Sequence, residues 1–243
     1  MRRIVCFVVI IVCCWALGAC SINKQTPLTK VAQHLEGNWI NQEYLEILRL
    51  TQSPQQADEA TAIKVIEVRT DSFKQLVLSF QEGDDWILDR NEEGLFFSSI
   101  FDYTLQLKTK LISNQKMQVG DKLFLRFSAD LGVWDKDILL VQQTLFTGCY
   151  DWEGKLVEFY KDGSIKGMEQ VGVKTYYPIV YYNNNQEMDQ IWLNKGNEKA
   201  TKYGFEFQKK KLYIYQLECP DQEVFCGEKN QRGKLLFELN KRG

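Results

Sequence analysis

Turn signals recur along most of the chain, and this pattern restricts the fold more than any other feature of the sequence. Clusters rich in glycine, asparagine and aspartate separate short apolar segments, as strands joined by tight turns require. The clusters lie at residues 82–84, 91–94, 119–121, 161–164, 183–185 and 194–197. The sequence therefore predicts an all-β fold, an antiparallel meander of hairpins.

Two hairpins are especially clear. Asp162-Gly163 separates the apolar segments 157–160 and 165–168, and both turn residues tolerate a positive φ. The basic stretch Lys209–Lys211 separates 203–207 from 212–215. We interpret it as a solvated hairpin tip, which also discourages edge pairing, rather than as a binding patch.

Helical patterns are confined to the N-terminal part of the chain. Residues 43–50 have a crowded apolar stripe that favours a helix over strict alternation. Ser53-Pro54 is typical of an N-cap followed by proline at the first helical position, and a short polar helix is expected from Gln55 to Ala62. We therefore expect one or two short helices near the N-terminus.

Two segments of the chain begin with similar sequences, which is weak evidence of an internal repeat. Gly37-Asn38-Trp39 opens one series of strand-like segments, and the stretch from Gly148 to Trp152 opens another of similar length. There are too many segments for one eight-stranded barrel, which favours two small β units. We place them at 34–146, which includes the helices, and at 147–243; a single large sandwich is the alternative.

The N-terminus combines a short basic segment, an uncharged run and a cysteine that follows two small residues. Met1-Arg2-Arg3 precedes an uncharged run, 4–17, which is too short for a transmembrane helix of about 20 residues. The run ends in Leu17-Gly18-Ala19-Cys20, which looks like the lipobox of a bacterial lipoprotein. The resemblance implies a signal peptide over 1–19 and lipidation of Cys20; the alternative is an ordinary secretory signal that contains cysteine.

The same resemblance implies a location. Acylation, for example with palmitate, would attach the chain to a membrane through Cys20. Ser21 follows where an aspartate would favour inner-membrane retention, so sorting to the outer membrane of a Gram-negative cell is implied. We expect residues 20–33 to form the lipidated cysteine and a polar tether, and the protein to face the periplasm.

Three cysteines remain once the signal peptide and Cys20 are set aside. An oxidising compartment favours disulfides, and Cys219 and Cys226 could close a tight loop. Cys149 would then be unpaired, and we expect a buried thiol beside aromatic neighbours. The alternative is a nucleophile that works with His34, although nothing nearby in the sequence would activate it.

Composition excludes several functions. The 30 basic and 32 acidic residues give a net charge of −2, so nucleic acid is a poor partner. His34 is the one histidine, which argues against a histidine metal site. No calcium, phosphate-loop or nucleophile-elbow pattern is present, and we expect no metal, cofactor or catalytic residue. Acidic residues cluster at Asp84, Asp85 and Asp89 and at Asp130, Asp135 and Asp137, but neither cluster has the spacing of a calcium site. Residues 183–189 are also rich in side-chain oxygens, which a hairpin tip explains.

Aromatic residues are more informative about function than the acidic clusters are. They include Trp39, Trp86, Trp134, Trp152, Trp192, Tyr176, Tyr177, Tyr181 and Tyr182. Such side chains usually fill a barrel interior; in an open barrel they would line an apolar or sugar-binding cavity. Inside and outside cannot be separated by pattern, because many strands are apolar on both faces.

Gly37-x-Trp39 followed by hairpins resembles the lipocalin-like (calycin) β-barrels. In the second unit, 148–150, 159–167 and 212–215 resemble lipocalin-like domains of bacterial lipoproteins. Lipocalins also pack an arginine over the first-strand tryptophan, and Arg126 is the candidate here. We expect Trp39 to be a buried packing residue, with the helix at 43–50 folded over it.

Two functions from different classes follow. The first is a non-enzymatic, lipid-anchored envelope protein that binds an apolar or glycan ligand or an envelope protein partner, or serves as a scaffold. The second is a lipid-anchored hydrolase that uses a pair of carboxylates. The single histidine and the lack of a catalytic motif favour the first.

Overall fold

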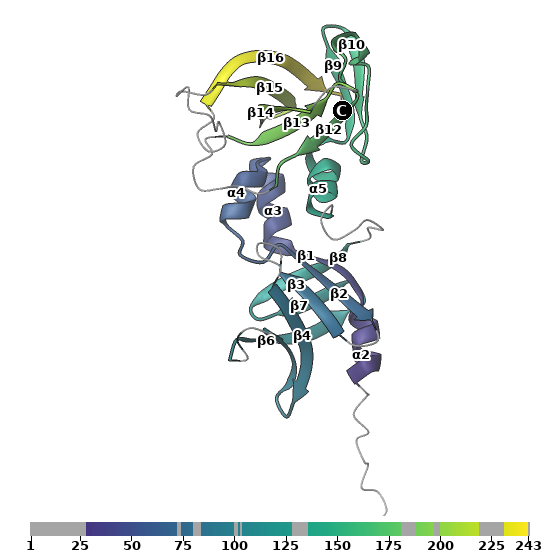
Figure 1. The fold of residues 1–243 in the computed structure, drawn as a ribbon, viewed down its shortest axis with the longest axis vertical. Coiled ribbons are helices and arrows are strands. Elements are labelled where there is room, and N and C mark those ends of the chain that lie inside the picture. Colours follow the sequence, from purple (N-terminus) through teal and green to yellow (C-terminus); the bar gives the residue numbers. More distant parts are fainter. Residues whose placement is uncertain are drawn as a thin grey trace, which may run out of the picture.

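Figure 1 shows a computed structural model of the chain, which describes residues 28–71, 74–79, 84–99, 102, 104–127, 136–180, 188–196, 200–218 and 231–242. Its helical elements are α2 (Leu28–Leu35), α3 (Gln42–Thr51), α4 (Pro54–Glu59), α5 (Lys136–Val141), the π-helical turn η2 (Gln142–Phe146) and the 3-10 turn η3 (Glu169–Val171). Two antiparallel sheets make up the rest, stacked along the long axis with α3, α4 and α5 between them (Figure 1).

The first sheet is a closed eight-stranded barrel in simple meander order. Its strands are β1 (Gly37–Asn41), β2 (Val65–Asp71), β3 (Lys74–Ser79), β4 (Asp84–Asn91), β5 (Gly94–Ser99), β6 (Gln106–Ser113), β7 (Lys116–Val119) and β8 (Lys122–Phe127). Closure comes from β1, which pairs with both β2 and β8. The prediction of antiparallel hairpins is confirmed.

The second sheet also has eight strands, in the order β11-β10-β9-β16-β15-β14-β13-β12. They are β9 (Gly148–Trp152), β10 (Lys155–Phe159), β11 (Ile165–Lys166), β12 (Thr175–Pro178), β13 (Gln190–Asn194), β14 (Thr201–Gln208), β15 (Lys211–Glu218) and β16 (Gln231–Lys241). The hairpins expected at Asp162-Gly163 and at Lys209–Lys211 are both present, with Gly163 and Lys209 at positive φ.

The sheet curls until its two edges meet. Ser164, beside β11, forms an isolated bridge to Thr175 of β12. The Ile165 amide donates to the Lys174 carbonyl at 2.8 Å, and the Tyr176 amide donates to the Gly163 carbonyl at 2.7 Å. This seam is shorter than an ordinary strand pair.

Side chains fill the interior of the first barrel. Trp39 is completely buried, and its indole Nε1 donates to the Leu35 carbonyl of α2 at 2.7 Å. The cluster comprises Ala32, Leu35, Trp39, Ile66, Val68, Trp86, Leu88, Phe97, Met117, Val119 and Phe124. Burial of Trp39 is therefore confirmed, as part of a packed core rather than of an open cavity.

Arg126 lies over Trp39. The guanidinium carbon is 4.3 Å from the ring centroid, a cation–π geometry. The same group donates to the carbonyls of His34, Glu36 and Asn114 at 2.6–2.7 Å. Arg126 thus ties α2, β1 and the β6–β7 turn together at one end of the barrel.

The expectation that the helix at 43–50 covers Trp39 is wrong. Successive side chains on a strand point to opposite faces, so Trp39 enters the barrel while Ile40 faces outward towards α3. Tyr44 and Leu48 of α3 join Ile40 in a second core, and α2 covers Trp39 instead. Helix α2 also occupies the end of the segment expected to be a polar tether.

Local signals for the two short helices are confirmed. Asn41 caps α3 through its Oδ1, which accepts from the Glu43 amide at 2.9 Å. Ser53 caps α4 through its Oγ, which accepts from the Gln56 amide at 3.1 Å, and Pro54 begins the helix. The fold class, all-β with a few short helices, is as predicted.

The second core joins α3, α5 and η2 to the interior of the second sheet. Phe146 at the end of η2 is completely buried, and its ring contacts those of Phe159, Tyr176, Phe205 and Phe207 at centroid distances of 5.0–6.2 Å. Such offset and edge-to-face arrangements are favourable for aromatic pairs. Phe146 therefore fills the end of the second barrel.

Polar contacts also connect α4 to the second sheet. Lys64 is completely buried, pairs with Asp58, and donates to the Val180 carbonyl at 3.4 Å. The Gln55 amide at the start of α4 donates to Asp189 Oδ1 at 2.8 Å. A charge this deeply buried is tolerated only when it is paired and hydrogen-bonded, so these contacts hold α4 in one place.

Candidate functional site

The aromatic side chains divide between the two faces of the sheets. Trp39, Trp86 and Trp152 are buried, whereas Trp192 is half-buried and Tyr177 is 44% exposed. Trp134, Tyr181 and Tyr182 lie outside the described residues. The buried tryptophans fill barrel interiors, as we expected, rather than line an open cavity. The candidate site is on the outer face of the second barrel.

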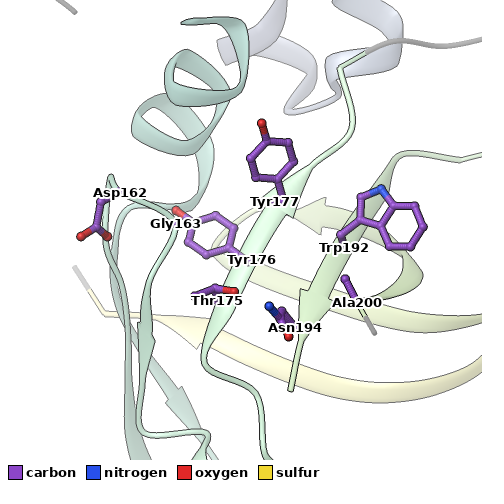
Figure 2. A pocket seen from close by; sticks show the side chains of 8 residues that line it. All are labelled: Asp162, Gly163, Thr175, Tyr176, Tyr177, Trp192, Asn194 and Ala200. Carbon is purple, nitrogen blue, oxygen red and sulfur yellow. The ribbon is translucent and has the colours of Figure 1, made fainter. Parts of the chain in front are cut away.

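Tyr177 and Trp192 are directly opposite each other on β12 and β13. The next outward pair along the same two strands is Thr175 and Asn194. Figure 2 shows these four side chains on neighbouring strands, beside the turn that carries Asp162 and Gly163. Together with Tyr176 and Ala200 they line a cavity of about 340 Å³.

The cavity lies over the short seam that closes the sheet. Gly163 (φ +82°) brings the 161–164 turn against β12: a Cβ there would lie 2.8 Å from Gln142 Nε2 and 2.9 Å from the Tyr176 carbonyl oxygen. A larger residue would push the turn away. Ala200, just before β14, contributes a small side chain to the lining.

Three polar residues, Asp162, Thr175 and Asn194, line the cavity alongside the aromatic pair. Asn194 Oδ1 is shielded from solvent and accepts no hydrogen bond from any residue that the structure describes. Asp162 Oδ1 accepts from the Ser164 hydroxyl at 2.7 Å and from the Ser164 amide at 2.9 Å. These bonds lower the pKa of Asp162, so it is ionised at neutral pH. Thr175 adds an exposed hydroxyl.

Lys202 on β14 is the next side chain across the sheet. It is opposite Trp192, and its Nζ is 5.4 Å from the centroid of the indole ring. Tyr176, whose ring points inward, donates its hydroxyl to the Tyr160 carbonyl at 2.8 Å, and burial raises its pKa. Tyr176 therefore supports the floor of the cavity and does not titrate at neutral pH.

Two further cavities lie where the sheets meet the helices. One, of about 420 Å³, is lined by Ile40, Leu45, Arg49, Leu125, Arg126, Phe127, Leu140, Gln143 and Thr144. The other, of about 390 Å³, includes Asp189, Glu206 and Arg232. Neither lining contains a tyrosine or a tryptophan, so the Tyr177–Trp192 cavity is the better candidate for ligand recognition.

Cys149 is not the buried thiol that we expected. It is exposed on β9, because its neighbours Tyr150 and Trp152 take the inward positions and strand alternation turns Cys149 outward. Its Sγ lies 3.9 Å from a Glu158 oxygen. His34, the proposed partner in the alternative, belongs to α2 on the first barrel, so the fold does not assemble a Cys149–His34 pair.

Most residues of the acidic clusters at 84–89, 130–137 and 183–189 lie outside the part of the chain whose side chains the structure describes. Asp89 is exposed on β4, and Asp189 is engaged by the Gln55 amide. Within the parts of the chain that the structure describes, no three His, Cys, Asp or Glu side chains gather closely enough to hold a metal ion.

Cys20, Cys219 and Cys226 lie outside the described residues. Their roles stay predictions, and the disulfide can be tested directly. We expect Cys219 and Cys226 to be joined, which in the chain-entropy model contributes about 2–3 kcal/mol for so short a loop. Peptide mapping without reductant should recover the joined peptide; two free thiols, or a bond from either to Cys149, would contradict the pairing.

Sequence reasoning found the aromatics of the cavity but not its polar lining. Tyr176, Tyr177 and Trp192 stood out by residue type. Thr175, Asn194 and Ala200 did not, because ordinary turn and strand residues become site residues only through the register of β12, β13 and β14. The local signals were the turn at Asp162-Gly163, which we predicted as a hairpin, and the turn cluster at 194–197.

Comparison with known proteins adds no assignment, since no protein-family model, curated protein or solved structure matches the chain. Among the helices that the structure describes, none is long and apolar enough to cross a membrane. The site must therefore be interpreted from its own geometry.

Proposed function

We propose that this protein is a lipid-anchored lipoprotein of the cell envelope that acts as a non-enzymatic binding protein. The anchor is Cys20, acylated after removal of residues 1–19, in the outer membrane and facing the periplasm. The binding surface is the Tyr177–Trp192 cavity on the outer face of the second barrel.

One observation carries the binding role: the outward-facing side chains of Tyr177 and Trp192 line a cavity that holds a single carboxylate among its described lining residues, Asp162. Glycosidase chemistry needs two carboxyl groups about 5–10 Å apart across the scissile bond. One carboxylate among aromatic, amide and hydroxyl groups is typical of recognition rather than of acid–base catalysis. The cavity of about 390 Å³ does contain Asp189 and Glu206, but the Gln55 amide donates to Asp189 and Arg232 pairs with Glu206. The carboxylate-dependent hydrolase is therefore the weaker alternative.

The first barrel supports a lipocalin-like kinship as part of the same proposal. Its first strand places Trp39 under Arg126, as the resemblance implies, within a closed eight-stranded barrel. Because its interior is filled with side chains, this unit would serve as a scaffold rather than as a carrier. It would set the binding unit at a distance from the membrane anchor.

The anchor is tested on the wild-type chain. Cells expressing the full sequence are grown with an alkyne analogue of palmitate, and the labelled protein is digested and mapped. We expect the label on a peptide that begins at Cys20. An unlabelled peptide that still continues into residues 1–19, or one that begins at another residue, would overturn the proposed anchor.

A further inference from the structure

We infer that the ligand of the Tyr177–Trp192 cavity is a short, neutral glycan, bound with the apolar face of a sugar ring against the aromatic pair. This inference rests on the proposed binding role and names its ligand class. Three observations carry it: the aromatic pair, the polar groups beside it, and the charge balance around it.

The aromatic pair supplies the platform. Tyr177 and Trp192 are opposite each other on adjacent strands, so their rings project from the same outward face at the separation of a cross-strand pair. The face of an aromatic ring carries negative charge density. Sugar C–H groups, which are slightly positive and lie together on one face of a pyranose ring, fit that surface.

Polar side chains in the same cavity supply hydrogen-bond partners beside the aromatic pair. Asn194 lines the cavity with its amide group, and Thr175, which carries a hydroxyl, is opposite it across the strands. Asp162 uses Oδ1 for its bonds to Ser164, which leaves Oδ2 as an acceptor. A purely apolar ligand would bury these groups unsatisfied, whereas sugar hydroxyls would satisfy them.

Charge and size limit the class further. Asp162 is the one charged side chain among the described lining residues, and the cations of Lys161 and Lys202 lie near it and near Trp192. The described lining therefore carries no cluster of like charges that would favour an acidic or a basic ligand. The volume of about 340 Å³ is near the lower end of the range for ligand cavities, about 300–1,000 Å³. A short segment of glycan fits, with the remaining sugars in solvent.

The test is isothermal titration of the acylated full-length protein, solubilised in a zwitterionic detergent because sugar-based detergents would compete. The probes are three neutral trisaccharides: chitotriose, cellotriose and maltotriose. We expect at least one to bind, with a Kd of about 0.1–1 mM. Trp192→Ala should weaken binding at least tenfold, and Trp192→Phe, which keeps a flat ring, should retain most of it.

Two more variants separate recognition from folding. Asn194→Ala removes only the shielded amide and should weaken binding several-fold, with an unchanged unfolding midpoint. Tyr213→Ala removes a half-buried aromatic from β15 of the same barrel, away from the cavity, and should bind as wild type. Wild-type affinity in both Trp192→Ala and Asn194→Ala would overturn the inference.

The ligand class and the binding surface can fail separately. If none of the trisaccharides binds but the uncharged apolar dye N-phenyl-1-naphthylamine binds in a way that Trp192→Ala abolishes, the glycan assignment is wrong and the proposed binding surface stands. If neither kind of probe depends on Trp192, both the inference and the proposed binding surface are wrong.

Discussion

Cys20→Ser is expected to abolish palmitate labelling completely and to yield either an uncleaved precursor or a chain released from membranes. The sulfur of Cys20 is the group that would carry the lipid, and a serine hydroxyl does not replace a thiolate in thioether formation. Each buried CH₂ of an acyl chain contributes about 0.8 kcal/mol to membrane attachment. Several chains therefore make attachment effectively permanent, and their loss is all-or-none.

The matched control for this variant is Cys14→Ser. Cys14 lies within the apolar run but is not preceded by the Leu17-Gly18-Ala19 triplet, so its replacement should leave labelling and membrane attachment intact. The measurement is in-gel detection of the alkyne label in washed membrane and soluble fractions. A Cys20→Ser protein that still takes up the label and sediments with membranes would contradict the lipobox assignment.

Trp39→Ala is expected to lower the free energy of unfolding by about 3–5 kcal/mol, the usual cost of removing a buried tryptophan. The side chain is fully buried in the first barrel, donates its indole N–H to the Leu35 carbonyl, and lies under the Arg126 guanidinium. Alanine would leave a cavity, an unpaired carbonyl and an arginine without its aromatic partner. The loss is comparable to much of the net stability of a domain.

Trp192→Ala is the matched control for stability, because it removes the same residue type from the outer face of a barrel. Its midpoint in urea should stay close to that of the wild type, while that of Trp39→Ala falls markedly. Circular dichroism followed through the transition measures both. A Trp39→Ala protein with an unchanged midpoint would show that this tryptophan is not a core residue.

Features set by a few adjacent residues could be predicted from the sequence. The Ser53-Pro54 cap, the Asp162-Gly163 turn and the lysine turn before β15 each depend on local backbone preferences, and each is present in the structure. Burial of Trp39 was also predicted, because a large apolar side chain on a short strand directly after Gly37 is expected to pack into a core.

Features set by partners distant in the sequence could not be predicted in the same way. Trp39 packs under α2 and Ile40 packs with α3, because the two side chains are on opposite faces of β1. Both residues are apolar, so the sequence alone does not indicate which of them faces the barrel interior. The same ambiguity concealed the outward position of Cys149. In the cavity, Thr175 and Asn194 become neighbours only through the pairing of β12 with β13, which no local pattern specifies.

We propose that ligand binds on the outer face of the second barrel and not inside either barrel. The indole N–H signals of ¹⁵N-labelled protein report on each tryptophan separately, and titration with the trisaccharide that binds would test the claim most directly. We predict that the Trp192 signal shifts with saturating dependence on sugar concentration, while the signals of buried Trp39, Trp86 and Trp152 stay in place. Shifts confined to the buried tryptophans, with Trp192 unmoved, would contradict it.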